Sequence, residues 1–189
     1  FVYYLMLGIF VLYLIEPEGM RGGLGLPDKM ADDIFGTYIA LTYLTPFIGG
    51  FLADRVLGYV KSIYLGGILM AAGYIGMGVF KDLPLFYTSL GLIIVGNGFF
   101  KPTISTLLGN LYSDEKYKAN KDSGYNIFYM GINIGAFICN IIAAFMRNKF
   151  GWGEAFITAG IGMLVGLVVF TVGMKHYRQA AEMKPVQEG

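Results

Sequence analysis

The sequence is poor in the groups that soluble domains, metal centres and disulfide-linked proteins need. Its 189 residues contain one cysteine, one histidine and 14% charged residues, whereas soluble domains carry about 25% charged residues. Cys139 alone cannot form an intrachain disulfide, and His176 alone cannot complete a zinc site. The 14 Lys and Arg are nearly balanced by 13 Asp and Glu, so the chain has no excess of positive charge with which to bind nucleic acid. These shortages exclude a soluble enzyme and argue against a metal cofactor or a nucleic-acid partner.

Apolar residues and glycine are abundant instead. Hydrophobic residues make up 56% of the chain, the mean hydropathy is +0.59, and there are 28 glycines, which allow membrane helices to approach closely. A spanning helix needs roughly 20 apolar residues. Charge-poor stretches therefore predict spans at about 1–16, 31–54, 61–80, 84–110, 122–147 and 154–175. The predicted fold class is an all-α membrane protein, with a six-helix transmembrane bundle over 1–176 and a cytoplasmic tail or inter-bundle linker over 177–189.

The two ends of the predicted bundle differ in charge. Eight Lys and Arg fall in the 54–61 loop, the 113–122 loop and the tail, against five on the other side. By the positive-inside rule both termini are predicted to be cytoplasmic, and Trp152 is predicted to sit in an interfacial belt at the outer end. The first stretch is short for a span and has no signal-peptide features, so we expect further residues upstream of it.

Lys101 is the one charge placed deep inside a predicted span, within GNGFFKPTIST at 96–106. A lone cation at the bilayer centre costs about 2.5 kcal/mol or more, so such a lysine normally faces a polar cavity and has a partner. Asn97 and Ser105 lie four residues away on the predicted face of Lys101, and Pro102 can kink the helix and expose a carbonyl. The alternative is a lysine paired only for packing.

No Asp or Glu lies between the ends of the six stretches. The partner of Lys101 is therefore expected from upstream residues, a missing half, another subunit or a substrate carboxylate.

Two further patterns are open to a functional and a structural interpretation. Tyr125, Tyr129 and Asn133 recur at a spacing of four, so they form a polar-tipped stripe that could bind a ligand or make interhelical hydrogen bonds worth about 0.6 kcal/mol each. The same two interpretations apply to Tyr3, Tyr4 and Tyr38. In GGFLADRVLGYVK at 49–61, Asp54 and Arg55 could form an ion pair that breaks when helices move, or belong to a solvated loop.

Three of these stretches resemble motifs of one transporter family. The Gly-Gly-x-x-Ala-Asp-Arg-x-x-Gly pattern resembles the loop motif of the major facilitator superfamily. YNIFYMGINIGAF at 125–137 and GNGFFKPTIST are similar to the fifth-helix and fourth-helix motifs of the proton-dependent oligopeptide transporters. Tyr3 and Tyr4, followed by IFVLYL at 9–14, resemble the first helix of that family.

The resemblance implies the N-terminal six-helix bundle of an alternating-access symporter that takes up di- and tripeptides with protons. It implies no cofactor other than the coupling proton, and no enzymatic activity. The implied partners are a small peptide, a C-terminal six-helix bundle not present in this chain, and the lipid bilayer of a bacterial inner membrane.

The resemblance also implies roles for individual residues. Lys101 matches the lysine of proton coupling and peptide recognition, and Asn133 matches a ligand of the peptide backbone. The cavity tyrosines correspond to Tyr3, Tyr4 and Tyr38, the gating loop to Gly50, Asp54, Arg55 and Gly58, and the helix kink to Pro102.

Two departures from the family pattern bear on activity. A Glu-x-x-Glu-Arg motif would precede Phe1, and Leu7 stands where the family has an arginine that helps to hold the peptide. Leu7 implies either a changed substrate preference or lost peptide binding. The alternative function is therefore a non-transporting accessory or structural subunit of a larger membrane complex that keeps a transporter-derived fold.

Overall fold

The charge-poor stretches fold as helices, because a backbone surrounded by apolar side chains must satisfy its own hydrogen bonds. The computed structural model describes residues 2–113 and 115–182, and the side chains of residues 2, 3, 20 and 178–182 lie outside that description. In chain order the elements are α1 (Val2–Ile15), α2 (Glu18–Arg21), α3 (Asp28–Leu52), a π-helical turn η1 (Ala53–Leu57), α4 (Tyr59–Val79), α5 (Leu83–Leu111), α6 (Glu115–Lys118), α7 (Lys121–Lys149) and α8 (Trp152–Glu182).

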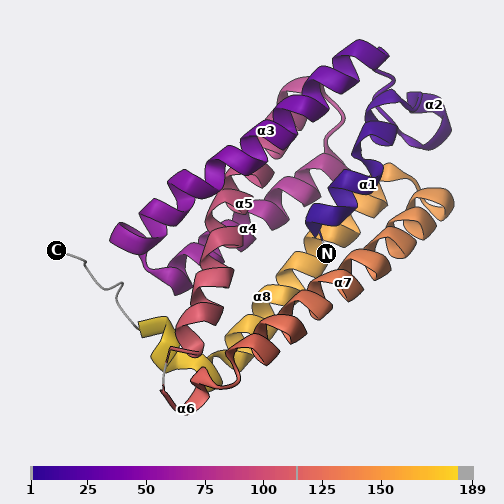
Figure 1. Cartoon of the computed structure of the whole chain (residues 1–189). Coiled ribbons are helices and arrows are strands. Elements are labelled where there is room, and N and C mark those ends of the chain that lie inside the picture. Colours follow the sequence, from indigo (N-terminus) through magenta and orange to yellow (C-terminus); the bar gives the residue numbers. More distant parts are fainter. Residues whose placement is uncertain (1, 114, 183–189) are drawn as a thin grey trace.

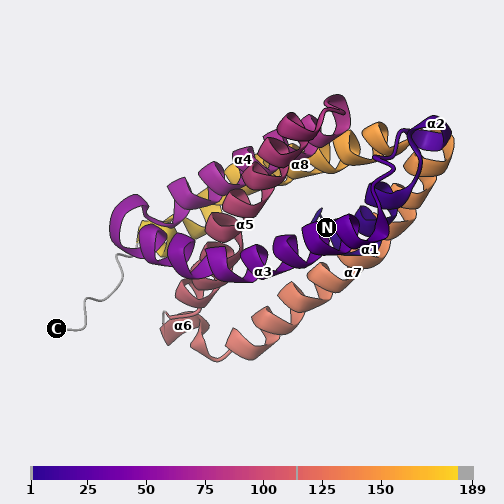
Figure 2. The same ribbon diagram turned by 90° about the horizontal axis from the view of Figure 1, so that it is seen from above.

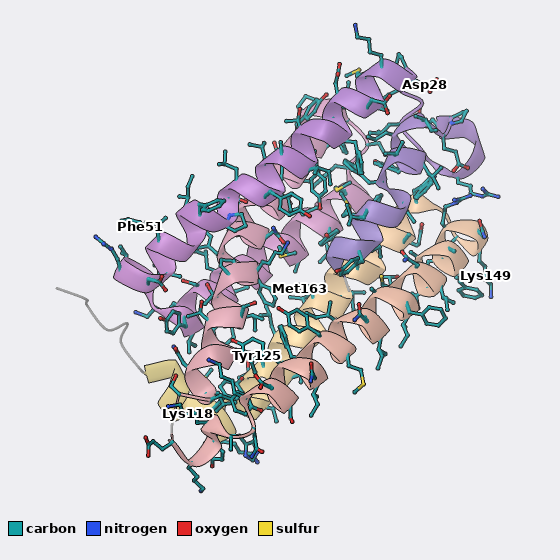
Figure 3. All side chains as sticks on the ribbon, in the orientation of Figure 1. Asp28, Phe51, Lys118, Tyr125, Lys149 and Met163 are labelled. Atoms are coloured by element: carbon teal, nitrogen blue, oxygen red, sulfur yellow. The ribbon has the colours of Figure 1, made fainter. Side chains whose placement is uncertain are left out.

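Five of these helical segments are long and apolar enough to cross a membrane. They are Asp28–Leu57, Tyr59–Val79, Leu83–Leu111, Lys121–Lys149 and Trp152–Tyr177, and a shorter apolar helix runs over Tyr4–Ile15. The long helices run between two ends of the molecule (Figure 1). Figure 3 places Asp28 and Lys149 toward one end, here called the outer end, and Phe51 and Lys118 toward the opposite, inner end.

Close helix contacts define the centre of the bundle. α4 packs most extensively with α5 and α8, and α3 packs on α5. At the α4–α5 contact, a Cβ atom on Gly66 would lie 2.6 Å from the Gly96 carbonyl oxygen, and one on Gly96 would lie 2.6 Å from the Gly66 oxygen. Only glycine at both positions lets the two backbones approach this closely.

α1 fills the outer half of the bundle with aromatic contacts. The Phe10 ring lies 5.3 Å from that of Tyr38 on α3, and the Tyr13 ring lies 4.8 Å from that of Phe156 on α8. The loop after α2 then folds back over the end of α1, where Leu24 N–H donates to the Tyr13 carbonyl at 3.0 Å. Backbone groups at the end of α1 are thus satisfied without water.

α7 is the least buried of the five long segments, and α4 is the most buried. The main contacts of α7 are with α8 and α1. Figure 2 shows α7 on one side of the bundle and α4 with α8 on the other. At the far end of the chain, α8 continues to Glu182 across a non-helical Tyr177 (φ −131°, ψ 19°). This interruption falls at the predicted boundary between bundle and tail, and residues 183–189 of that tail lie outside the described residues.

Candidate functional site

Lys101 lies in the second half of α5, on an exposed face of the bundle. Its Nζ is 5.0 Å from the centroid of the Tyr43 ring on α3. A cation over an aromatic face is attracted by the ring quadrupole, most strongly where water is scarce. Tyr43 is itself 58% exposed. The ammonium and the aromatic ring therefore form an open site along the line where α3 meets α5.

The polar neighbours predicted for Lys101 divide between two environments. Ser105 is exposed, and its hydroxyl donates to the Lys101 carbonyl at 3.5 Å. Asn97 is only 4% exposed, and its Nδ2 donates to the Thr42 carbonyl of α3 at 3.2 Å. Asn97 and Lys101 therefore both contact α3, but Asn97 is buried in that contact while Lys101 lies at its exposed edge.

Each of the two helices in this contact contains a proline. Pro46 lies inside α3 and Pro102 inside α5. The side chain of Pro102 is close to the predicted gating-loop residue Gly50, where an added Cβ would meet the proline Cβ at 3.5 Å. The loop motif and the lysine-proline motif, far apart in sequence, therefore pack against each other.

The predicted cavity tyrosines do not share one position. Tyr38 is 1% exposed and its ring meets that of Phe10 edge-on, so its placement in a cavity is not what the structure shows: it belongs to the packed core. Tyr4 is 37% exposed on α1. Tyr3 lies in α1, but its side chain is outside the described residues. Sequence reasoning missed Tyr43, because a spacing of five from Tyr38 puts the two on different helix faces and nothing in the sequence showed which face is open.

Tyr129 and Asn133 of the α7 stripe face outward, whereas the Tyr125 hydroxyl lies near Gly109 of α5. Tyr129 is 57% exposed, Asn133 is exposed, and the rings of Tyr125 and Tyr129 lie 6.4 Å apart. Further along α7, Asn140 packs on α1, where a Cβ on Gly8 would lie 2.7 Å from its Oδ1 atom. Asn133 is thus available to a ligand, on a helix that touches the α1 segment carrying Tyr4.

The gating-loop residues form the inner end of α3. Asp54 and Arg55 lie in the π-helical turn, and Gly58 follows with φ 78° before α4 begins. The Arg55 guanidinium carbon lies 4.7 Å from the Phe51 ring centroid. The ion pair that Asp54 and Arg55 could form is absent from the described part of the chain, where the Arg55 guanidinium lies over Phe51.

A partly buried ionic cluster at the outer end was not foreseen. Glu16 binds Arg21 at 3.2 Å, lies 3.9 Å from Arg147 Nε and accepts a hydrogen bond from Trp152 Nε1 at 3.0 Å. Trp152 is 0% exposed, so its predicted place in an interfacial belt is wrong: its indole N–H is used inside the bundle. Sequence proximity linked Glu16 only to Arg21, since Trp152 and Arg147 come from the distant α7–α8 connection.

Within residues 2–113 and 115–182, no three His, Cys, Asp or Glu side chains come together as a metal site. The chemistry available at the exposed face is that of one cation, aromatic rings and amides. Such groups can bind a polar solute.

Comparison with known proteins agrees with this geometry. The family model of the POT family matches residues 60–187. A *Bacillus subtilis* protein named as the uncharacterized transporter YclF is 40% identical over 93% of this chain and 35% of its own length. A di-/tripeptide transporter of *Lactococcus lactis* subsp. *lactis* is 39% identical over 94% of this chain and 36% of its own length. The chain therefore spans about a third of these relatives.

Solved structures show the same likeness in three dimensions. A crystal structure of a POT peptide transporter in complex with alafosfalin is 36% identical, with a TM-score of 0.88 over 97% of this chain and 38% of that one. A POT family transporter in complex with a thioalcohol-conjugated peptide is 33% identical, with a TM-score of 0.80 over 90% of this chain and 34% of that one. The predicted fold class, a helical bundle from the N-terminal part of a major-facilitator transporter, is confirmed. The chain is an integral membrane protein segment that belongs to the POT family.

Proposed function

We propose that the protein containing this chain is a proton-coupled symporter of di- and tripeptides or related small solutes, and that this chain supplies its N-terminal bundle. The observation that carries the proposal is Lys101, kept on an exposed face of α5 with its ammonium over Tyr43. A charge at this depth costs free energy unless it serves a ligand, a proton or a partner helix. The *Lactococcus* relative named as a di-/tripeptide transporter supports the choice of substrate.

Lys101 can serve both the substrate and the proton. Its ammonium can bind the carboxylate of a peptide or pair with a carboxylate from another part of the protein. Protonating that second carboxylate removes its charge, so Lys101 is released to the substrate. Uptake of a proton and binding of a peptide are coupled in this way without any other cofactor.

Leu7 limits what α1 can contribute. It is 36% exposed, but its isobutyl side chain cannot form an ion pair. In our proposal the substrate carboxylate is therefore held by Lys101, while the exposed Tyr4 and Asn133 offer hydrogen bonds to the rest of the molecule. A smaller or less charged solute than a typical peptide is compatible with this arrangement.

Alternating access requires a second bundle. We propose that a C-terminal six-helix bundle packs against the open side of this one, with substrate between them near the membrane midplane. Exposed apolar side chains on α3 and α7, such as Phe47 (78% exposed) and Phe137 (69%), can face lipid or that bundle. Asp54, Arg55, Gly50 and Gly58 would form the inner gate, and both termini of this bundle would lie in the cytoplasm of a bacterium, with the bundle in its inner membrane.

The test is uptake by the protein expressed from its complete gene and reconstituted in proteoliposomes. Radiolabelled dialanine should accumulate under an inward proton gradient, and a protonophore should abolish accumulation. Absence of proton-driven uptake of di- and tripeptides, together with copurification at fixed stoichiometry with other membrane proteins, would instead establish an accessory subunit.

A further inference from the structure

We propose that Asn97 is a positioning residue for Lys101. Asn97 donates a hydrogen bond to the Thr42 carbonyl, which has no helical donor because Pro46 lacks an N–H. This bond holds α3 and α5 in the register that places the Lys101 ammonium over Tyr43. This inference rests on the proposed role of Lys101 in transport. It assigns Asn97 no contact with substrate, because the side chain is buried between α3 and α5.

Pro46 creates the need for an outside donor. In an α-helix the N–H of each residue bonds to the carbonyl four residues earlier, and proline has no N–H. Within α3, Pro46 therefore leaves the Thr42 carbonyl without its helical partner. Thr42 is 0% exposed, so neither water nor lipid can supply a donor there.

Asn97 meets that need from the neighbouring helix. Its Nδ2 lies 3.2 Å from the Thr42 carbonyl oxygen. One turn away, the Thr45 hydroxyl donates in the opposite direction, to the Ile94 carbonyl of α5 at 3.1 Å. The Asn97 bond is the more important of the two. The Ile94 carbonyl already accepts the helical hydrogen bond from the Gly98 N–H, four residues later, whereas the Thr42 carbonyl has no such donor.

The second proline makes the contact reciprocal. Pro102 deprives the Gly98 carbonyl of its helical donor in the same way. That carbonyl oxygen occupies the space where a side chain on Gly49 of α3 would begin, so it packs on the Gly49 Cα, where a weak C–H···O contact is possible. Each helix thus presents its freed carbonyl to the other, and this fixes the register of α3 against α5.

That register determines where the lysine ammonium lies. Asn97 and Lys101 are one turn apart on α5, and their partners on α3, Thr42 and Tyr43, are adjacent. The buried hydrogen bond and the exposed cation–ring contact therefore join the same turn of α5 to the same turn of α3. If Asn97 is lost, α3 and α5 can shift, and the ammonium no longer has a fixed place over Tyr43.

A double-variant cycle in the protein expressed from its complete gene tests this mechanism. The variants are Asn97→Ala, Pro46→Ala and the pair, with Thr45→Val as the control at the same helix contact. Pro46→Ala gives residue 46 an N–H that can serve the Thr42 carbonyl, so Asn97→Ala should matter much less in that background. The two measurements are the melting temperature of the purified protein and the pH profile of dialanine uptake in proteoliposomes.

We expect Asn97→Ala alone to lower uptake about tenfold and to move the midpoint of the pH profile by about half a unit, since the carboxylate proposed to carry the proton no longer has the ammonium at a fixed distance. The double variant should match Pro46→Ala in melting temperature and pH midpoint, and Thr45→Val should keep the wild-type midpoint. If Asn97→Ala alone does not fold, recovery of folded protein in the double variant supports the proposal, and failure of both overturns it.

Additive melting shifts, or an Asn97→Ala pH profile that matches the wild type after scaling, would overturn the role of Asn97 and leave the proposed function standing. Absence of wild-type uptake would overturn the proposed function and the transport role of Asn97 with it.

Discussion

Two charged regions of this bundle differ in the exposure of their charged side chains and in the partners that surround them. At the outer end, Glu16 has a side chain only 13% exposed, accepts hydrogen bonds from Arg21 and Trp152, and forms a longer ion pair with Arg147. On the α3–α5 face, Lys101 is exposed, with its ammonium over the ring of Tyr43. The enclosed carboxylate ties α1 to the α7–α8 connection. The exposed ammonium lies over an aromatic ring, where our proposal has it meet the substrate.

Because Lys101 is exposed, its position depends on the contact between α3 and α5, and we expect that contact to be rigid. Gly49→Ala should have the largest effect on stability, because its Cβ would overlap the Gly98 carbonyl oxygen. Overpacking of this kind costs about 1–3 kcal/mol or more, which lowers the melting temperature of the purified protein. Gly36→Ala on the same helix is the matched control, since nothing lies within 4 Å of its Cβ. Equal melting temperatures for the two variants would contradict the close α3–α5 contact.

The outer cluster should be the next most sensitive region. Glu16→Ala removes the acceptor of Trp152 and the partner of both arginines. Leaving such part-buried donors unsatisfied costs about 1–3 kcal/mol, again measured as a lower melting temperature. Glu18→Ala, an exposed glutamate two residues later, should leave the melting temperature nearly unchanged. A variant of Glu16 as stable as that of Glu18 would show that the cluster does not tie the helices together.

Trp152→Phe should give the smallest of these effects. Phenylalanine keeps an aromatic ring against Tyr13, whose ring lies 5.7 Å from that of Trp152, and beneath the Arg147 guanidinium. It loses the N–H that reaches Glu16 and part of the volume of the buried indole, and the melting-temperature cycle described below separates the two losses. A single hydrogen bond in a membrane protein is worth about 0.6 kcal/mol. In the Glu16→Ala background the same change should cost less, as a melting-temperature cycle can show. Full additivity of the two changes would argue against the hydrogen bond.

The difference between the two regions also explains what could be predicted from the sequence. Hydropathy places helices, so the helix that carries Lys101 followed from the sequence. The packing of two distant motifs through Gly50 and Pro102 is seen only in the structure. Side-chain direction did not follow. The side chains of Asn97 and Tyr38 point into the bundle, and the buried Trp152 donates its indole N–H to the Glu16 carboxylate.

The physical reason is that membrane helices are apolar on most faces, so the pattern of a single helix does not show which face is open. Tyr38 and Tyr43 are equally plausible by residue type, and only the contact of α3 with α1 and α5 separates them. The Glu16 cluster joins residues more than 130 positions apart, as in the Trp152–Glu16 hydrogen bond with a separation of 136. Spacing within a helix cannot reveal such a pair.

Lys101→Ala tests the central claim most directly. In proteoliposomes containing the protein expressed from its complete gene, proton-driven dialanine uptake should fall by at least about tenfold, while the melting temperature changes little because Lys101 is exposed. Lys61→Ala, which removes an exposed lysine at the start of α4, should keep wild-type uptake. Proton-driven uptake by Lys101→Ala equal to that of the wild type would contradict the claim that this ammonium couples the proton to the substrate.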